Sequence, residues 1–163
     1  MTAFRFRRPR EEDHPRVLDV APDWWADRRV RPRVRRVWFR HFTSCSWLAE
    51  TPEGRLAGVL IGFVSPDDPS VGVIQLLGVS PNHRRSGLGR ELIARFEADV
   101  ASLGVRRLEA AVWPDDRIAV TFLRALGFRP DDGPGTQPLY GTPAYADYEG
   151  PGEDVAILVR DLA

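Results

Sequence analysis

A glycine-containing turn between an apolar strand and an amphipathic helix constrains this chain more than any other part of its sequence. Residues 71–79 are apolar enough to predict a strand that is buried on both faces. Residues 88–103 then carry apolar side chains at helical spacing. Gly87 and Gly89 lie where the strand gives way to the helix. Backbone N–H groups point outward together in such a turn, and a helix start carries a partial positive charge, so the sequence predicts a phosphate or diphosphate site.

The residues around this turn narrow the class of ligand. Arg84, Arg85 and Arg90 add hydrogen-bond donors that stay protonated and match phosphate oxygens. The chain has no lysine, so it cannot contain the Gly-Lys pair of a Walker loop, and that class of nucleotide-binding protein is excluded. A dinucleotide-binding turn would have a third glycine where this chain has Leu92. The sequence therefore disfavours that class as well.

Two motifs resemble those of a known family. The pattern Arg84-x-x-Gly87-x-Gly89 is similar to the acetyl-CoA signature of the GNAT superfamily of acyl-CoA-dependent N-acetyltransferases. Residues 116–128 resemble the second motif of that family. The resemblance implies an α/β (α+β) fold, with a central mixed, mostly antiparallel sheet of six to seven strands and helices on both faces. It also implies that the sheet splays open between strands 71–79 and 105–113.

The resemblance further implies acetyl-CoA as co-substrate and no metal. The pantetheine arm would lie in the opening of the sheet, bonded to backbone groups of Leu77 and Val79, with the diphosphate on the amides of residues 85–90. The implied cofactor-binding residues come from the strand end, the turn and the second motif: Leu77, Gly78, Val79, Arg84, Arg85, Ser86, Gly87, Leu88, Gly89, Arg90, Asp116 and Phe122.

The second motif departs from the family at two positions. Asp116 stands where many members have asparagine, although aspartate also caps a helix well. Leu123 replaces a tyrosine that can protonate the departing thiolate. The thiolate would then take its proton from another group or leave as the anion, which a thiol pKa of about 8.5 permits.

Acetyl transfer by direct amine attack would need an oxyanion donor and a base. The backbone N–H of Val79 is the natural oxyanion donor. Tyr148 and Asp116 are candidate catalytic side chains, but the sequence does not single out a base. The alternatives left open are Tyr140, Tyr145, Glu149 and His41.

Charge patterning indicates the acceptor. Acidic residues Asp147, Glu149, Glu153 and Asp154 surround a tyrosine-rich segment before the last strand, and they would attract a primary amine of a small molecule or peptide. The candidate acceptor-binding residues are Trp25, Trp38, His41, Tyr145 and Glu149, with Trp24 and Phe42 as further walls. Two alternatives stay open: these aromatic side chains pack in the core, or N-terminal arginines hold an anionic substrate.

The chain is expected to form a single acetyltransferase domain over residues 1–163. Expected elements alternate between strands and helices, with a loop-rich segment before the last strand. They are a strand at 4–7, a helix at 11–21, a helix starting at Pro32 with Val34, Val37, Trp38, His41 and Phe42 on its apolar face, a hairpin at 46–64, strands 71–79 and 105–113, helices 88–103 and 115–126, loops at 130–152 and a strand at 154–159.

Composition excludes several other classes of protein. The 23 basic and 23 acidic residues balance, and Arg33, Arg36 and Arg40 of the arginine-rich stretch 28–40 fit the solvent-exposed face of a helix, so we expect no nucleic-acid partner. The longest apolar run, residues 56–64, is too short to span a membrane, and no signal segment is evident, so we expect a cytoplasmic protein. Cys45 is the only cysteine, which excludes an internal disulfide. Five tryptophans favour a homodimer. The alternative function is a catalytically silent acyl-CoA sensor or interaction domain.

Overall fold

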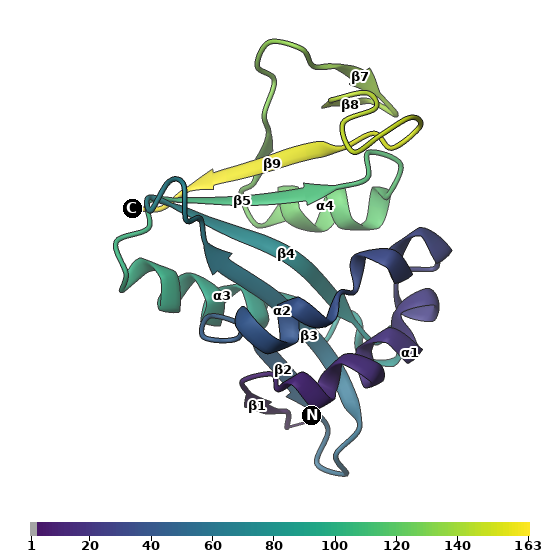
Figure 1. Ribbon diagram of the computed structural model, residues 1–163, viewed down its shortest axis with the longest axis vertical. Helices are drawn as coiled ribbons and strands as arrows, with labels where there is room; N and C mark the ends of the chain where they lie inside the picture. The colour runs from purple at the N-terminus through teal and green to yellow at the C-terminus, as the bar shows by residue number, and fades with distance from the viewer. Residues whose placement is uncertain (1–2) are drawn as a thin grey trace.

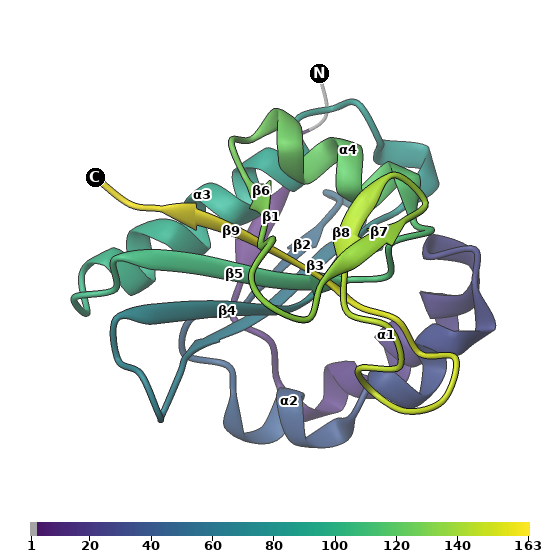
Figure 2. The same ribbon diagram turned by 90° about the horizontal axis from the view of Figure 1, so that it is seen from above.

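A central sheet with helices on both faces forms the body of the protein (Figures 1 and 2). The computed structural model describes residues 3–163. In chain order the elements are β1 (Arg5–Arg7), η1 (Glu11–Asp13), α1 (His14–Trp24), η2 (Arg28–Arg33), α2 (Arg36–His41), β2 (Trp47–Glu50), β3 (Leu56–Val64), β4 (Val71–Val79), η3 (Pro81–His83), α3 (Leu88–Ala101), β5 (Arg107–Val112), α4 (Arg117–Ala125), β6 (Arg129–Pro130), β7 (Gln137–Leu139), β8 (Thr142–Ala144) and β9 (Ala156–Asp161), where η denotes a 3-10 helix.

The sheet topology confirms the mixed, mostly antiparallel sheet expected from the sequence. Seven strands pair in the order β1-β2-β3-β4-β5-β9-β6, and β7 pairs with β8 in a separate two-stranded sheet. Among the described strand pairs, only β4 and β5 run parallel. Parallel strands need a crossover connection, and α3 supplies it between β4 and β5.

Strand β4 leaves its neighbour β5 halfway along its length. The β4–β5 pairing ends at Ile74 opposite Ala110, whereas the β3–β4 pairing continues to Val79 opposite Gly58. Gln75 is an extra residue in β4, because Ile61 pairs with Leu76 and the next residue of β3 pairs with Ile74. Such a bulge bends a strand and increases its twist. The sheet therefore opens on the β5 side of β4, as the sequence resemblance implies.

The two faces of the sheet have separate apolar cores. On one face α1, η2 and α2 bury Val17, Phe39 and other side chains against Val59 and Ile61. On the other face α3 and α4 pack against β3 and β5, and Figure 2 shows these helices opposite α1 and α2. The ring of Phe96 fits because Gly62 has no side chain: a β-carbon there would lie 2.4 Å from the ring. Truncating such a buried ring costs about 3–5 kcal/mol.

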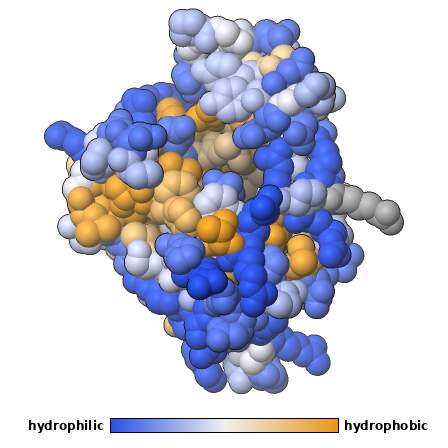
Figure 3. Space-filling view, viewed as in Figure 1, coloured by the Kyte–Doolittle hydropathy of each residue, from blue (hydrophilic) through white to orange (hydrophobic). Residues whose placement is uncertain are grey.

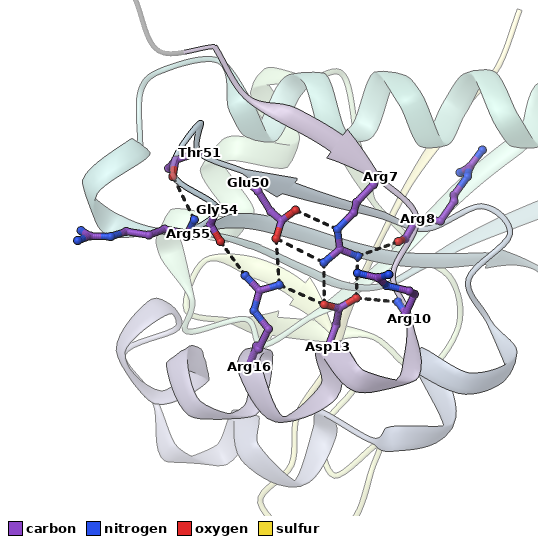
Figure 4. A network of polar contacts seen from close by, with 9 residues as sticks. All are labelled: Arg7, Arg8, Arg10, Asp13, Arg16, Glu50, Thr51, Gly54 and Arg55. Carbon is purple, nitrogen blue, oxygen red and sulfur yellow. Dashed lines mark hydrogen bonds and ion pairs between the residues drawn. The ribbon is translucent and has the colours of Figure 1, made fainter.

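A charged network joins the start of α1 to the edge of the sheet (Figure 4). The carboxylate of Asp13 accepts hydrogen bonds from Arg7 at 2.8 and 2.9 Å and from the backbone N–H of Arg10 at 2.7 Å. Glu50 accepts from Arg7 at 2.9 Å and from Arg16 at 3.0 Å. Burial alone would raise the pKa of Asp13, but these donors outweigh burial and hold it below its usual range. The Arg7 hydrogen bond likewise lowers the pKa of Glu50.

The expected ends of the first two helices are wrong. Helix α1 continues past Pro22 to Trp24, because Ala21 and Trp24 bury their side chains between the helix and the sheet. The second helix begins at Arg36, and Pro32 lies inside the preceding η2. Within this helix the buried residue is Phe39.

The expected apolar face of that helix is wrong in part: Val34 is buried just before the helix and Trp38 packs against the core, but Val37 and His41 are exposed. Val37 is 43% exposed, whereas Phe39 is 1% exposed. The closing strand is also shifted, from the expected 154–159 to Ala156–Asp161. The segment expected to be loop contains the short strands β7 and β8.

Among the described residues, none of the helices is both long and apolar enough to cross a membrane.

Candidate cofactor and acceptor site

Backbone groups of β4 face the opening of the sheet. Ser80 donates its N–H to Ala57 O at 2.8 Å, so Ser80 and Ala57 form a hydrogen-bonded pair that continues the β3–β4 ladder. Hydrogen-bonded and non-hydrogen-bonded pairs alternate in an antiparallel ladder, so the N–H and C=O groups of Gly78 point towards β3. Those of Leu77 and Val79 point the other way, to the side where β5 has diverged. Of these three residues, Leu77 and Val79 thus offer main-chain hydrogen bonds to a ligand.

The turn after β4 has the backbone geometry of an anion-binding loop. Arg85 has a φ of 63° and Gly87 a φ of 83°, both left-handed. Helix α3 starts at Leu88, with Gly87 as its N-cap. Left-handed residues before a helix start turn successive N–H groups to one side, where the helix dipole also favours negative charge. The geometry agrees with the diphosphate site expected at residues 85–90.

The side chains of this turn divide into exposed and buried ones. Arg85 and Arg90 are exposed and have neither a hydrogen bond nor an ion pair with any residue that the structure describes. Ser86 donates its hydroxyl to His83 O. Leu88 is 2% exposed and packs in the core, so it can offer a ligand only its backbone.

The two glycines of the turn are required for different structural reasons. Gly87 needs its left-handed φ, and a β-carbon there would meet nothing within 4 Å. Gly89 instead permits a close approach of α3 and α4, because a β-carbon there would lie 2.9 Å from Phe122 Cζ. Phe122 thus has a packing role at the junction of the turn, β4 and α4, which the glycine spacing alone does not reveal.

Two contacts tie the end of α1 to the same region. The guanidinium of Arg84 donates a hydrogen bond to the backbone carbonyl of Trp24. The indole of Trp25 lies on Gly78, where a β-carbon would be 2.3 Å from Trp25 Cη2. Gly78 lies between the two residues whose main-chain groups face the opening. Of the aromatic residues proposed as acceptor walls, the structure brings Trp25 to the open part of β4.

Asp116 caps α4 at the other side of the opening. Its carboxylate accepts the N–H of Ala119 at 3.1 Å, as expected of an N-cap. Burial raises the pKa of Asp116, and the hydrogen bond from Ala119 N–H partly offsets this effect, with a smaller contribution from the charge of Arg84. Leu123, about two turns further along α4, is 3% exposed and lies in the core.

A rim of charged residues around Trp113 borders the end of β5. Arg29 and Arg33 lie over the indole of Trp113, with their guanidinium carbons 4.2 and 4.9 Å from the ring centroid. Arg29 also contacts Asp115 at 3.2 Å, and Arg33 contacts Glu153 at 3.7 Å. These contacts join η2 to the loop before β9. They depend on residues far apart in the sequence, and the sequence analysis missed Trp113 because it read as the last residue of a strand.

The residues proposed from the acidic segment differ in their surroundings. Tyr145 donates its hydroxyl to Asp131 at 2.9 Å, a bond that raises the pKa of Tyr145. The ring of Tyr148 lies 5.2 Å from that of Tyr145 and is 54% exposed. Glu149 is exposed. Tyr145 exchanges backbone hydrogen bonds with Val155 just before β9, on the edge that faces β6, so β9 separates Tyr145 from β5.

Two of the acidic residues hold the loop itself. Asp147 accepts the N–H of Gly152 at 2.6 Å, and Asp154 accepts the N–H of Asp147 at 2.9 Å. Their hydrogen-bonding capacity is therefore partly used. Of the four acids, Glu149 has a carboxylate that accepts no hydrogen bond and forms no ion pair among the residues that the structure describes.

Other proposed residues lie elsewhere. Trp38 stacks on Phe63 with centroids 6.1 Å apart, and Phe63 pairs with Val73, near the start of β4. Six residues of strand separate Val73 from Val79, or about 20 Å. His41 is exposed at the end of α2. Tyr140 is 63% exposed and lines a small cavity on α4. The structure does not bring Trp38 or His41 to the open part of β4.

The surface also indicates a binding face. Figure 3 shows apolar side chains gathered in a partly hollowed region, framed by hydrophilic surface. Ligand sites commonly combine apolar walls with a few polar groups. In the described part of the chain, no group of three His, Cys, Asp or Glu side chains is arranged to hold a metal ion.

The opening of the sheet beside β4 and the glycine turn before α3 are the features expected of the GNAT fold. Comparison with known proteins supports the same family. The model of the acetyltransferase (GNAT) family matches residues 8–128. The chain belongs to this family.

Individual relatives include both sequences and solved structures. An L-2,4-diaminobutyric acid acetyltransferase from Nocardia farcinica is 30% identical over 115 residues, which cover 71% of this chain. The match spans 59% of that relative's length. A GNAT-family acetyltransferase structure from Desulfovibrio desulfuricans is 21% identical, with a TM-score of 0.77 over 99% of this chain and 100% of that one.

A third relative is a ligand-bound structure. Diaminobutyrate acetyltransferase EctA from Paenibacillus lautus, in complex with L-2,4-diaminobutyric acid and coenzyme A, is 21% identical. Its TM-score is 0.64 over 97% of this chain and 95% of that one. At this identity, the two structures share the fold with this chain.

Proposed function

We propose that this protein transfers an acetyl group from acetyl-CoA to a primary amine of a small molecule. The observation that carries the proposal is the open side of β4, where main-chain groups of Leu77 and Val79 have lost β5 as a partner and a left-handed turn follows. Membership of the GNAT family and the relatives that act on diaminobutyric acid support it.

The residues present fit acetyl-CoA. Leu77 and Val79 would hydrogen-bond the amide groups of the pantetheine arm. The amides of residues 85–90 would bind the diphosphate, with Arg85 and Arg90 as exposed cationic partners. Acetyl-CoA would supply a thioester that an amine can attack.

Within this site the chain's own groups would perform three tasks. The N–H of Val79 faces the opening and would donate to the carbonyl oxygen as negative charge develops on it. The indole of Trp25 would exclude water from one side of the opening and help to orient the amine. Glu149 and Tyr148, in the loop before β9, are the candidates to accept the amine proton, with the N-cap Asp116 as a further candidate.

The acceptor is proposed to be small and cationic. Glu149 donates its backbone N–H to Glu153 O at 3.2 Å, and Glu153 contacts Arg33 of the rim around Trp113, so an ammonium group entering there would meet a carboxylate. We take L-2,4-diaminobutyric acid as the first amine to test, because relatives carry that substrate in their names.

Calorimetric titration and a thiol-release assay test the proposal together. We expect CoA and acetyl-CoA to release heat with one-to-one stoichiometry, and free thiol to form faster when an amine is added. Diaminobutyric acid, simple diamines and a dipeptide form the panel, with acetyl-CoA alone as the blank. If neither cofactor binds, the proposal is wrong.

A catalytically silent acyl-CoA-binding domain is the second candidate. Leu123, which replaces the family's tyrosine proton donor, favours it. Cofactor binding without amine-dependent thiol release across the panel would support this candidate over the enzyme.

A further inference from the structure

Arg84, the first residue of the glycine motif, bonds to a helix end. Its guanidinium donates to the carbonyl of Trp24, the last residue of α1. The last carbonyls of a helix lack partners within the helix, and a cation there also interacts favourably with the helix dipole. The bond joins residues 60 positions apart in the sequence and fixes the end of α1 against the turn after β4.

The residue after this helix end forms a wall of the opening. Trp25 follows Trp24 directly, and its ring lies on Gly78 without room for a β-carbon. The ring therefore sits between the levels of Leu77 and Val79 in β4. If the end of α1 moved, the wall would move with it.

Another arginine of the same turn has no hydrogen bond of this kind. Arg85 is exposed, has a left-handed backbone, and has no hydrogen bond or ion pair to any residue in the described range 3–163. The guanidinium of Arg85 can therefore bind a phosphate without first breaking a hydrogen bond within the protein. Arg84 would have to give up its bond to Trp24 first.

We propose that Arg84 is a positioning residue for the acceptor side of the site, and that it holds Trp25 over Gly78 by bonding to the end of α1. This inference rests on the proposed function, because it assigns the acceptor to the side of the opening that Trp25 borders. It separates two neighbouring arginines of the motif: Arg84 sets the amine site, and Arg85 serves the cofactor's phosphates.

Variants of the two arginines test this division. Arg84→Met keeps the length of the side chain but removes its donors, Arg84→Lys restores one donor, and Arg85→Met is the matched control. We expect Arg84→Met to raise the KM for the amine about tenfold while the Kd for CoA changes less than about threefold, because a lost hydrogen bond to a charged group corresponds to roughly a factor of ten or more. Arg84→Lys should recover part of the loss. Arg85→Met should raise the Kd for CoA and leave the amine KM unchanged.

A second pair of variants covers the case in which Arg84→Met does not fold. Gly78→Ala places a β-carbon against the Trp25 ring, so it should raise the amine KM in the wild-type background and have little effect in a Trp25→Ala background. Equal effects in both backgrounds contradict the inference. So does an Arg84→Met variant that loses CoA affinity and keeps its amine KM. Failure of the wild type to bind CoA overturns the proposed function itself, whereas these results overturn only the role of Arg84.

Discussion

Gly89 in α3 and Phe122 in α4 are in contact so close that a β-carbon on the glycine would lie 2.9 Å from the edge of the ring. The helix that follows the glycine turn and the helix of the second family motif therefore pack through this one position.

Replacing Gly89 by alanine should destabilise the protein through this contact. Alanine gains up to about 1 kcal/mol in helix propensity, but overpacking costs about 1–3 kcal/mol. We expect a net loss of stability and a weaker affinity for CoA, measured by thermal unfolding and calorimetry. The double variant with Phe122→Leu should recover stability, because a shorter side chain makes room for the methyl group. Full stability of Gly89→Ala alone would show that the ring moves aside freely.

Gly87 should respond to substitution through its backbone instead. Its φ of 83° is left-handed and its surroundings are open. Gly87→Ala is expected to cost about 1 kcal/mol, and Gly87→Asn less, because asparagine tolerates this conformation better. Thermal denaturation of the two variants measures the difference. Equal losses for alanine and asparagine would argue against backbone strain as the cause.

The network around Asp13 should make the protein sensitive to acid. The folded-state pKa values of Asp13 and Glu50 are lowered, so their contribution to stability is complete above the unfolded-state values of about 4 and is lost as pH falls through the folded-state values. We expect the unfolding temperature to drop steeply below about pH 4. Asp13→Asn should be less stable at neutral pH, because it leaves Arg7 without its bidentate partner. Its unfolding temperature should also change less between neutral and acidic pH.

Asp116 should show the opposite pH dependence. Its folded-state pKa is raised, chiefly by burial, so its ionisation costs stability as pH rises through that value. Asp116→Asn keeps a helix cap and removes the buried charge, so we expect it to match or exceed the wild type in unfolding temperature at neutral pH, with the difference shrinking in acid. Asp116→Ala, which removes the cap, should lose about 1 kcal/mol. If Asp116→Asn were less stable than the wild type at neutral pH, the carboxylate of Asp116 would have a stabilising partner that outweighs burial.

Charge reversal in the acidic loop should separate attraction of the amine from loop stability. Glu149→Arg is expected to raise the KM for a diamine several-fold with little change in unfolding temperature, because the side chain is exposed. Asp147→Ala should instead lower the unfolding temperature, since it removes the acceptor for Gly152 N–H. Glu12→Arg makes the same charge change on exposed η1 and serves as the control. Equal amine KM values for Glu149→Arg and Glu12→Arg would contradict an acidic acceptor side.

The sequence predicted the parts of the fold that depend on neighbouring residues. Strand β4 was expected at residues 71–79 and is observed there, because its apolar run ends at polar residues on both sides. The phase of α2 could not be predicted, since the choice between Val37 and Phe39 as the buried residue depends on how a short helix meets the sheet. The end of α1 was missed because Pro22 disfavours a helix locally, while burial of Trp24 under the sheet extends it.

The candidate site also has parts that the sequence predicted and parts that it did not. The glycine spacing was enough to place the turn, whereas the left-handed conformation of Gly87 comes from the structure. The contacts of Trp25 with Gly78 and of Arg84 with Trp24 link distant segments, so no local pattern encodes them. Trp38 and His41 were grouped with Trp25 because they share the N-terminal region, but α2 carries them towards the start of β4.

The unpaired Gln75 in β4 changes which residues of the strand, even- or odd-numbered, face α3. Before Gln75, the even-numbered Gly72 and Ile74 face α3; after it, the odd-numbered Leu77 and Val79 do, and Gly78 turns to Trp25. Removing Gln75 would leave the other pairs of the β3–β4 ladder in place, because Gly62 opposite Ile74 and Ile61 opposite Leu76 are already consecutive pairs, and Gly78 would still face the indole. A deletion of that one codon would instead straighten β4 and reduce its twist, so it would act on the divergence of β4 from β5 and leave the side chains on each face where they are.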